Sequence, residues 1–108
     1  MLITEKRVEK ALRLLAQTDD EVAVAKANEM RTEFMAKTAE ALAFKQAEGS
    51  SAEERRQLSR LTDEVQTKHE EHFKAVAEHA RLRARREREM IILDLWRTQQ
   101  ADQRRGNV

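Results

Sequence analysis

The chain has 108 residues, of which 38% are charged and 4% aromatic, with no Cys, no Pro and a formal net charge of +1. This length allows one domain, and the lack of cysteine excludes a disulfide framework or a thiolate metal site. The longest apolar runs, such as residues 90–93, are too short to cross a membrane, and charged residues begin at Glu5. We therefore expect a cytoplasmic protein without a membrane segment or signal peptide.

Charge is distributed unevenly along the chain. Residues 1–80 carry 13 Lys and Arg against 16 Asp and Glu, whereas residues 81–108 carry 8 Arg against 4 acids. The C-terminal part is therefore basic by +4, and the part before it is acidic by −3.

The first predicted helix covers about residues 5–17. Thr4 is a suitable N-cap, and apolar residues then recur at helical spacing. The segment Thr18-Asp19-Asp20-Glu21 has the pattern of a capping box, which predicts a second helix over about residues 19–48. Because neither Gly nor Pro separates the two segments, a single kinked helix is the alternative.

Two apolar stripes follow the second predicted helix. One contains Ala23, Ala27, Met30, Phe34, Ala41 and Phe44, and the adjoining one contains Val24, Met35, Ala39 and Leu42. Two stripes on one helix predict contacts with more than one neighbour.

The strongest turn signal is residues 49–51, where Gly49 suits the left-handed position after a helix and Ser51 begins a second capping box. A third helix is predicted over about residues 52–104, within which there is no Gly or Pro. Helices joined by so short a link lie antiparallel. The predicted fold is thus all-α: a coiled-coil-like antiparallel hairpin with one very long C-terminal helix and a short N-terminal helix.

The register of this hairpin follows from its turn, because paired residue numbers should sum to about 100. Met30 is then expected opposite residues 70–73, Phe44 opposite residues 56–58, and Arg81 opposite residues 19–21. The apolar N-terminal residues fall opposite the end of the third helix.

An apolar cluster near the C-terminus consists of Ile91, Ile92, Leu95 and Trp96. A helix that is apolar on nearly all sides is buried on all sides, and the N-terminal segment can cover only one of them. The cluster therefore predicts an oligomer interface, and a homo-oligomer is the expected state.

Arginines gather just before this cluster. Arg81, Arg85 and Arg88 share one helical face, and guanidinium groups at one-turn spacing can neutralise a nucleic-acid backbone. Arg97, Arg104 and Arg105 in the tail could extend such a contact, or the tail could act as a docking peptide anchored by Trp96. The competing interpretation is a solvated face with ion pairs to the acids at residues 19–21.

The three histidines, His69, His72 and His79, fall on one side of the third helix. They are weak candidates for a divalent metal, because their spacing matches no established helical metal motif. A polar layer in a helical seam is the favoured interpretation, and pH-sensitive assembly is a third. No side chains pair as nucleophile and base, so we expect no enzyme activity and no cofactor.

The tail Leu95-Trp96-Arg97-Thr98, followed by Ala101 and Arg104-Arg105-Gly106, resembles the ends of small helical proteins encoded by tailed phages and prophages. The resemblance implies an accessory protein made in a bacterial host cytoplasm and transfers no site residue. The expected function is non-enzymatic assembly through the C-terminal cluster, and the alternative is a nucleic-acid-binding accessory module that uses residues 81–88.

Overall fold

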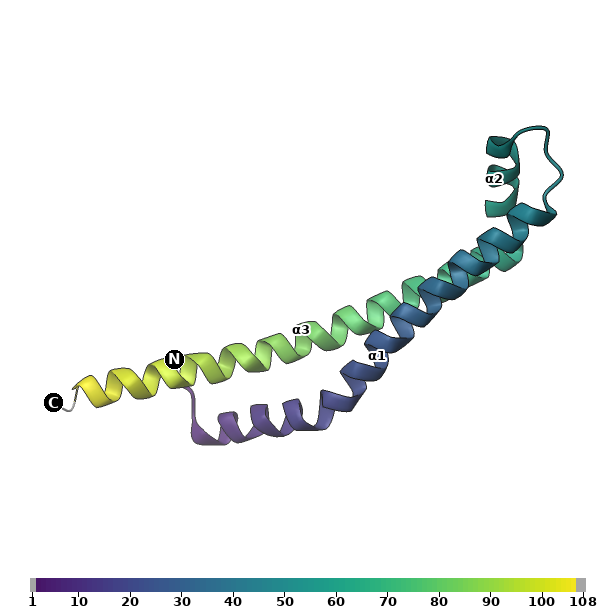
Figure 1. Cartoon of the computed structure of the whole chain (residues 1–108). Coiled ribbons are helices and arrows are strands. Elements are labelled where there is room, and N and C mark those ends of the chain that lie inside the picture. Colours follow the sequence, from purple (N-terminus) through teal and green to yellow (C-terminus); the bar gives the residue numbers. More distant parts are fainter. Residues whose placement is uncertain (1, 107–108) are drawn as a thin grey trace. The chain divides into compact units, whose positions relative to one another are not determined.

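The computed structural model describes residues 2–106, with helices α1 (Glu5–Gln46), α2 (Ala52–Arg60) and α3 (Asp63–Gly106) (Figure 1). No strand occurs among these residues, which confirms the all-α prediction. Their contacts form two compact units: unit 1 comprises residues 2–23 and 80–106, and unit 2 comprises residues 24–79.

Helix α1 is continuous over 42 residues, which corrects the expected helices at 5–17 and 19–48. Thr4 begins it as predicted, because the Thr4 Oγ1 accepts from the amide of Arg7 at 3.1 Å. Thr18 does not cap a new helix. Its hydroxyl instead donates to the carbonyl of Leu14 at 2.7 Å, a bond that threonine makes inside a helix. The alternative of one near-continuous helix is therefore the correct one.

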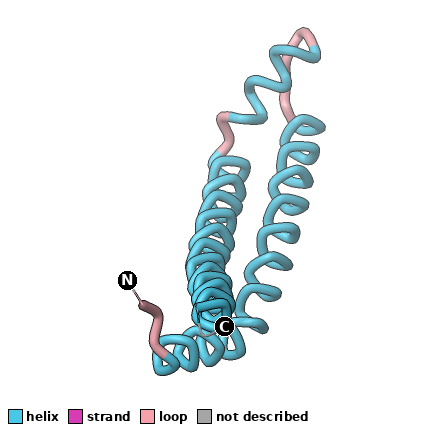
Figure 2. Tube along the Cα trace, turned by 90° about the vertical axis from the view of Figure 1, so that its left-hand side faces the viewer, coloured by secondary structure: helices cyan, strands magenta, loops and turns pink. Residues whose placement is uncertain are grey.

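The loop after α1 spans residues 47–51, one of the two non-helical links in Figure 2. Gly49 does not have the positive φ expected of it. It provides room instead, because a Cβ at this position would lie 2.7 Å from the Cγ of Arg55 and 3.1 Å from its amide nitrogen. Close approach of the α2 backbone is therefore what requires a glycine here.

Ser51 caps α2, accepting from the amide of Glu54 at 3.1 Å as the capping box predicts. The Glu54 carboxylate does not reach the Ser51 amide but accepts from the hydroxyl and the amide of Ser50, at 2.6 and 3.2 Å. These hydrogen bonds hold the pKa of Glu54 below its ordinary value.

The predicted helix over 52–104 is interrupted at Leu61 and Thr62, which separate α2 from α3. The amides of both residues bond to carbonyls three residues back, and the Thr62 side chain accepts from the amide of Val65 at 3.4 Å. Thr62 thus caps α3, and two acids follow it in the first turn. Neither Gly nor Pro marks this interruption.

Unit 2 is joined along a seam, defined as the positions that alternate three and four residues apart and face the other long helix. On α1 they are Ala25, Glu29, Thr32, Ala36, Ala39 and Ala43, and on α3 they are Val65, Lys68, His72, Ala75 and His79; all are buried or half-buried. Glu29 pairs with His79, Thr32 with His72, and Glu40 with His69. This order shows that the helices run in opposite directions within the unit. Thr32, not Met30, lies opposite His72.

Unit 1 has a seam of the same spacing. On α1 its residues are Val8, Ala11, Leu15, Thr18 and Val22, and on α3 they are Leu82, Arg86, Glu89, Leu93, Trp96 and Gln100; all are buried or half-buried. Arg7 forms a 2.7 Å ion pair with Glu89, and Gln99 exchanges two hydrogen bonds with the backbone of Ile3, at 2.8 and 2.9 Å. The helices of this unit are antiparallel as well.

The register predicted Arg81 opposite residues 19–21, but in unit 1 it is Arg86 that contacts Asp19. It donates to the carbonyl of Leu15 and the hydroxyl of Thr18, both at 2.7 Å, and to the carboxylate of Asp19 at 2.6 Å. The predicted ion pair across the helices therefore exists, with a different arginine. A charged group in a seam is stable when such acceptors surround it.

Candidate interaction surfaces

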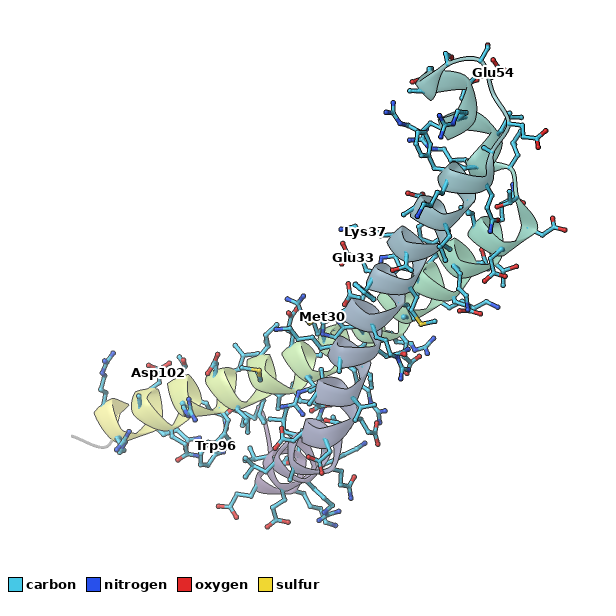
Figure 3. The ribbon with its side chains drawn as sticks, turned by 45° about the vertical axis from the view of Figure 1, so that its right-hand side comes forward. Met30, Glu33, Lys37, Glu54, Trp96 and Asp102 are labelled. Atoms are coloured by element: carbon cyan, nitrogen blue, oxygen red, sulfur yellow. The ribbon has the colours of Figure 1, made fainter. Side chains whose placement is uncertain are left out.

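The predicted C-terminal cluster does not form one face of α3. Trp96 (labelled in Figure 3) is half-buried in the seam, and its indole nitrogen is buried without a hydrogen-bond partner. Ile92, beside the seam, is also half-buried. Ile91 and Leu95 face outward, with 55% and 53% of their surfaces exposed. The cluster is therefore divided between the seam and the surface.

The N-terminal segment covers its part of the seam, as the register predicted. Val8 and Ala11 are buried, whereas Leu2 and Leu12 remain exposed. Part of the predicted apolar set thus contributes nothing to unit 1 itself.

A second group of exposed apolar side chains lies in unit 2, where the sequence reasoning did not place an interface. It consists of Met30 and Phe34 on α1 and Phe73 and Val76 on α3, which are 62%, 71%, 60% and 36% exposed. We call these four residues the outer patch. The seam pairs made by Thr32 and Glu29 place α1 residues 29–34 beside α3 residues 72–79, so the patch residues lie at one level of the unit.

Charged and polar side chains around the outer patch interact within the chain. Glu33 and Lys37, which follow Met30 on α1 in Figure 3, form an ion pair of 3.1 Å. The hydrogen bond and charge of Lys37 hold the pKa of the exposed Glu33 carboxyl below its ordinary value. Glu40 is occupied by His69. The sequence did contain a signal for this patch. On α1, Met30 and Phe34 lie on the side of the helix away from the stripe of small residues Ala25, Ala36 and Ala39.

Each histidine has a separate partner across the unit 2 seam. His72 and His79 are seam residues and His69 lies beside the seam, and the three bind Thr32, Glu29 and Glu40 respectively. Among residues 2–106 no three His, Cys, Asp or Glu side chains converge as metal ligands would. His72 and His79 are therefore polar residues of the seam, and His69 is a polar residue beside it.

The arginine stripe gains two cations from α1. Arg7, Lys10, Arg85 and Arg88 line one hollow of about 560 Å³ in unit 1, together with Leu14, Glu89, Ile91 and Ile92. Arg81 precedes Arg88 by two turns on the same helix and has its own interaction. We call the side of unit 1 that contains this hollow the basic side.

The tail arginines are exposed. Arg97 pairs with Asp94 at 3.5 Å and Arg105 with Asp102 at 4.0 Å, each within α3, while Arg104 stands at the exposed end of the same helix. The last two residues of the proposed docking tail, 107 and 108, lie outside the described residues. The described part of the tail is helical as far as Gly106.

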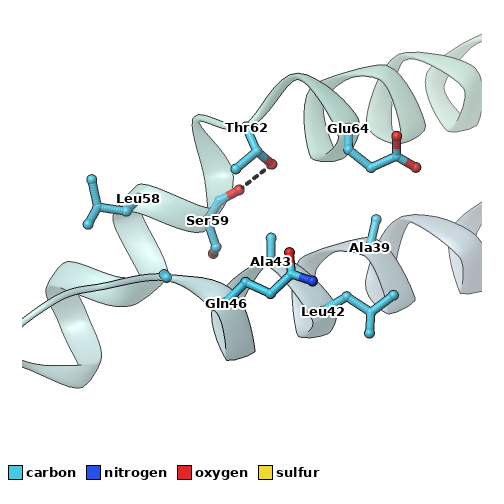
Figure 4. A pocket seen from close by; sticks show the side chains of 9 residues that line it. Ala39, Leu42, Ala43, Gln46, Leu58, Ser59, Thr62 and Glu64 are labelled. Carbon is cyan, nitrogen blue, oxygen red and sulfur yellow. Dashed lines mark hydrogen bonds between the residues drawn. The ribbon is translucent and has the colours of Figure 1, made fainter.

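A second hollow, of about 370 Å³, lies in unit 2 where α1 ends (Figure 4). Its lining includes Ala39, Leu42 and Leu58, and Thr62 donates there to the carbonyl of Ser59 at 2.9 Å. Glu64 is its one ionisable side chain, so the lining offers no acid–base pair.

No helix within residues 2–106 combines the length and the apolarity needed to span a membrane. Comparison of the chain with protein-family models, curated proteins and solved structures finds no match.

Proposed function

We propose that this protein is a non-enzymatic helical assembly protein, a coiled-coil-like antiparallel hairpin that self-associates through the outer patch of unit 2. The observation that supports this most is that unit 2 buries small side chains and leaves large apolar side chains exposed. The largest side chain less than 2% exposed is Val65, whereas Met30, Phe34 and Phe73 are each at least 60% exposed. The seam of this unit buries mainly alanine and polar groups, and the large apolar groups lie outside it.

The energetic argument follows from side-chain size. Burial of a Phe or Met side chain contributes about 1.5 to 3 kcal/mol, and an alanine contributes far less. If two copies cover each other's outer patch, both copies bury patch side chains, so each covered residue contributes its burial free energy twice. Large apolar side chains that remain exposed on a long helix are candidates for a contact with another chain.

A second copy is the favoured occupant because charges of both signs lie beside the patch. Glu33 pairs with Lys37 on α1, and Lys74 stands next to Phe73 on α3. Two identical patches can therefore meet with acids of one copy near bases of the other. The cluster first expected to form the interface is different, because Ile91 lies among Arg7, Lys10, Arg85 and Arg88. Two copies meeting there would bring cations against cations.

The resemblance of the tail to proteins of tailed phages and prophages supports an accessory role in a phage-infected or lysogenic bacterium. We propose that the assembly acts in the host cytoplasm as a scaffold or adaptor, with no cofactor and no reaction of its own.

The test is the mass in solution of the full chain, measured by light scattering at tens of micromolar. Wild type should have the mass of a dimer or a larger assembly. The double variant Phe34→Asp/Phe73→Asp should be monomeric with unchanged helix content, because two carboxylates cannot be buried in the contact without partners. A monomeric wild type would falsify the proposal.

Two controls make the result specific. Thr38→Asp/Thr67→Asp adds the same charge at exposed positions outside the patch and should leave the mass at the wild-type value. The second control, Ile91→Asp/Leu95→Asp in the C-terminal cluster, should also leave the mass at the wild-type value. If this second pair dissociates the assembly while Phe34→Asp/Phe73→Asp does not, self-association uses the C-terminal cluster and the outer patch is not the interface.

A further inference from the structure

The basic side of unit 1 combines cations and apolar groups in one surface. Arg7 and Leu14 each precede a seam residue of α1 by one position, and Arg85 and Ile92 each precede a seam residue of α3 by one position. Positions of this kind flank the seam, and all four side chains line the same hollow. Lys10 and Arg88 lie one turn further along the same faces, three positions on from Arg7 and Arg85.

The apolar side chains of this surface stand at the same helical positions as its cations. Leu14 follows Arg7 by one heptad on α1, and Ile92 and Leu95 follow Arg85 and Arg88 by one heptad on α3. Leu14 and Ile92 are half-buried, whereas Ile91 and Leu95 are exposed. Each helix thus contributes both cations and apolar groups. Two features predicted separately from the sequence, the arginine stripe and the C-terminal cluster, therefore belong to one surface.

The charge of this side is not cancelled within the unit. Unit 1 carries 12 Lys and Arg against 9 Asp and Glu, a net charge of +3, and unit 2 carries 9 against 11, a net charge of −2. Glu89 is the only acid that lines the hollow, and Arg7 is its partner. Lys10, Arg85 and Arg88 are exposed and have no acid in the lining besides Glu89. The hollow therefore presents an excess of positive charge to an anionic partner.

We propose that the basic side of unit 1 binds an acidic amphipathic helix from a partner protein. A helix with apolar residues at i, i+3, i+4 and i+7 can place them against Leu14, Ile91 and Ile92, as in helix-in-groove recognition. Glu or Asp side chains beside them then meet Arg7 and Lys10 of α1 and Arg85 and Arg88 of α3.

Nucleic acid fits the same surface less well. A phosphate backbone would satisfy the cations but would leave Leu14, Ile91 and Ile92 against charged oxygens. Binding to single strands commonly uses aromatic side chains on which bases stack, and none lines this hollow. A second copy of the same surface would set four cations against four. An acidic amphipathic helix satisfies both components.

The experiment measures binding of a labelled designed peptide to the full chain by fluorescence anisotropy. The peptide is a helix of about six turns with Leu at heptad spacing and Glu on both flanks. One comparison peptide has every Glu replaced by Lys, and another has every Leu replaced by Ser. A duplex oligonucleotide of about 20 base pairs is the nucleic-acid probe.

Wild type should bind the Glu/Leu peptide, and both comparison peptides should bind at least about tenfold more weakly. Affinity for the Glu/Leu peptide should fall only several-fold between about 50 and about 200 mM salt, because part of the contact is apolar. A backbone contact with many phosphates loses about a thousandfold or more over that range.

The decisive variant is Lys10→Glu/Arg88→Glu, at two exposed positions of the basic side. It should lose about tenfold or more in affinity for the Glu/Leu peptide and gain affinity for the Lys/Leu peptide. The matched control, Arg104→Glu/Arg105→Glu, makes the same change of net charge at the exposed end of α3 and should bind as wild type does. Ile91→Ser should weaken binding of the Glu/Leu peptide without removing its salt dependence.

Three outcomes would overturn the proposal: no binding of the Glu/Leu peptide, equal loss in the tail control, or equal binding of the Leu-to-Ser peptide together with tighter binding of the duplex. The last would assign the surface to nucleic acid. The same titration with Phe34→Asp/Phe73→Asp separates this proposal from self-association, because that variant should still bind the peptide as a monomer.

Discussion

Units 1 and 2 use the same seam spacing with different side chains. The seam of unit 1 holds Val8, Leu15, Leu93 and Trp96 and is linked by the buried Glu89 with Arg7. The seam of unit 2 holds alanines and histidines, and its larger apolar side chains form the outer patch. The comparison shows that spacing decides which positions face the other helix, whereas composition decides how much apolar surface is hidden there.

The largest single-residue effect is expected in unit 1 on replacement of Arg7 by Met. Glu89 is 8% exposed and would keep a buried charge without its cation. We expect a loss of about 2 to 3 kcal/mol in the free energy of unfolding, measured by urea titration followed by circular dichroism. His69→Ala in unit 2 removes a partner of Glu40, but both side chains are more than a third exposed, so it should cost no more than about 1 kcal/mol.

The double variant Arg7→Met/Glu89→Met should recover most of that loss, because it removes the buried charge itself. If Arg7→Met and His69→Ala lowered the free energy of unfolding equally, the ion pair of unit 1 would contribute no more to stability than the histidine pair of unit 2.

An intermediate effect should separate the seam of unit 2 from its outer patch. Val65→Ala removes volume from a side chain 1% exposed and should cost about 1 to 2 kcal/mol, whereas Val76→Ala at 36% exposure should change the free energy of unfolding by less than about 0.5 kcal/mol. Both are best measured in the Phe34→Asp/Phe73→Asp background, where self-association does not contribute. A larger effect at Val76 than at Val65 would place the core of the unit outside its seam.

The smallest effect concerns the two glycines, one in each unit. Gly49→Ala brings a Cβ against the Cγ and the amide nitrogen of Arg55, so we expect a loss of about 1 kcal/mol in thermal or urea unfolding. Gly106→Ala has nothing within 4 Å of the new Cβ and should be neutral or stabilise the end of α3 slightly. Tolerance of alanine at both positions would show that the backbone at Gly49 can move away from α2.

Much of the fold could be predicted from the sequence. The lack of Gly and Pro, the caps at Thr4 and Ser51 and the glycine turn indicated long helices, and the contacts of the structure place them antiparallel within each unit. The break expected at Thr18 was wrong because a threonine hydroxyl can bond inside a helix as well as begin one. The break at Thr62 was missed because its signal, a threonine followed by two acids, is as weak as many that occur inside helices.

The candidate surfaces were harder to predict, because apolar periodicity does not state which stripe faces the other helix. Met30 and Phe34 were expected to face α3, yet the small residues Ala36 and Ala39 do so. The reason is that an alanine stripe lets two backbones approach closely, while seam polar groups such as His72 and His79 find partners there. Larger side chains were then left outside.

The seam spacing along α1 has eleven successive positions, from Val8 to Ala43, without an irregular step. Each residue advances the helix by about 100°, so the loss or gain of one residue would rotate every following side chain to a new direction. A change of seven residues, by contrast, keeps later positions nearly in phase. Natural length variants of α1 should therefore differ by whole heptads, with a matching change in α3, and shorter insertions should be confined to the loop at residues 47–51.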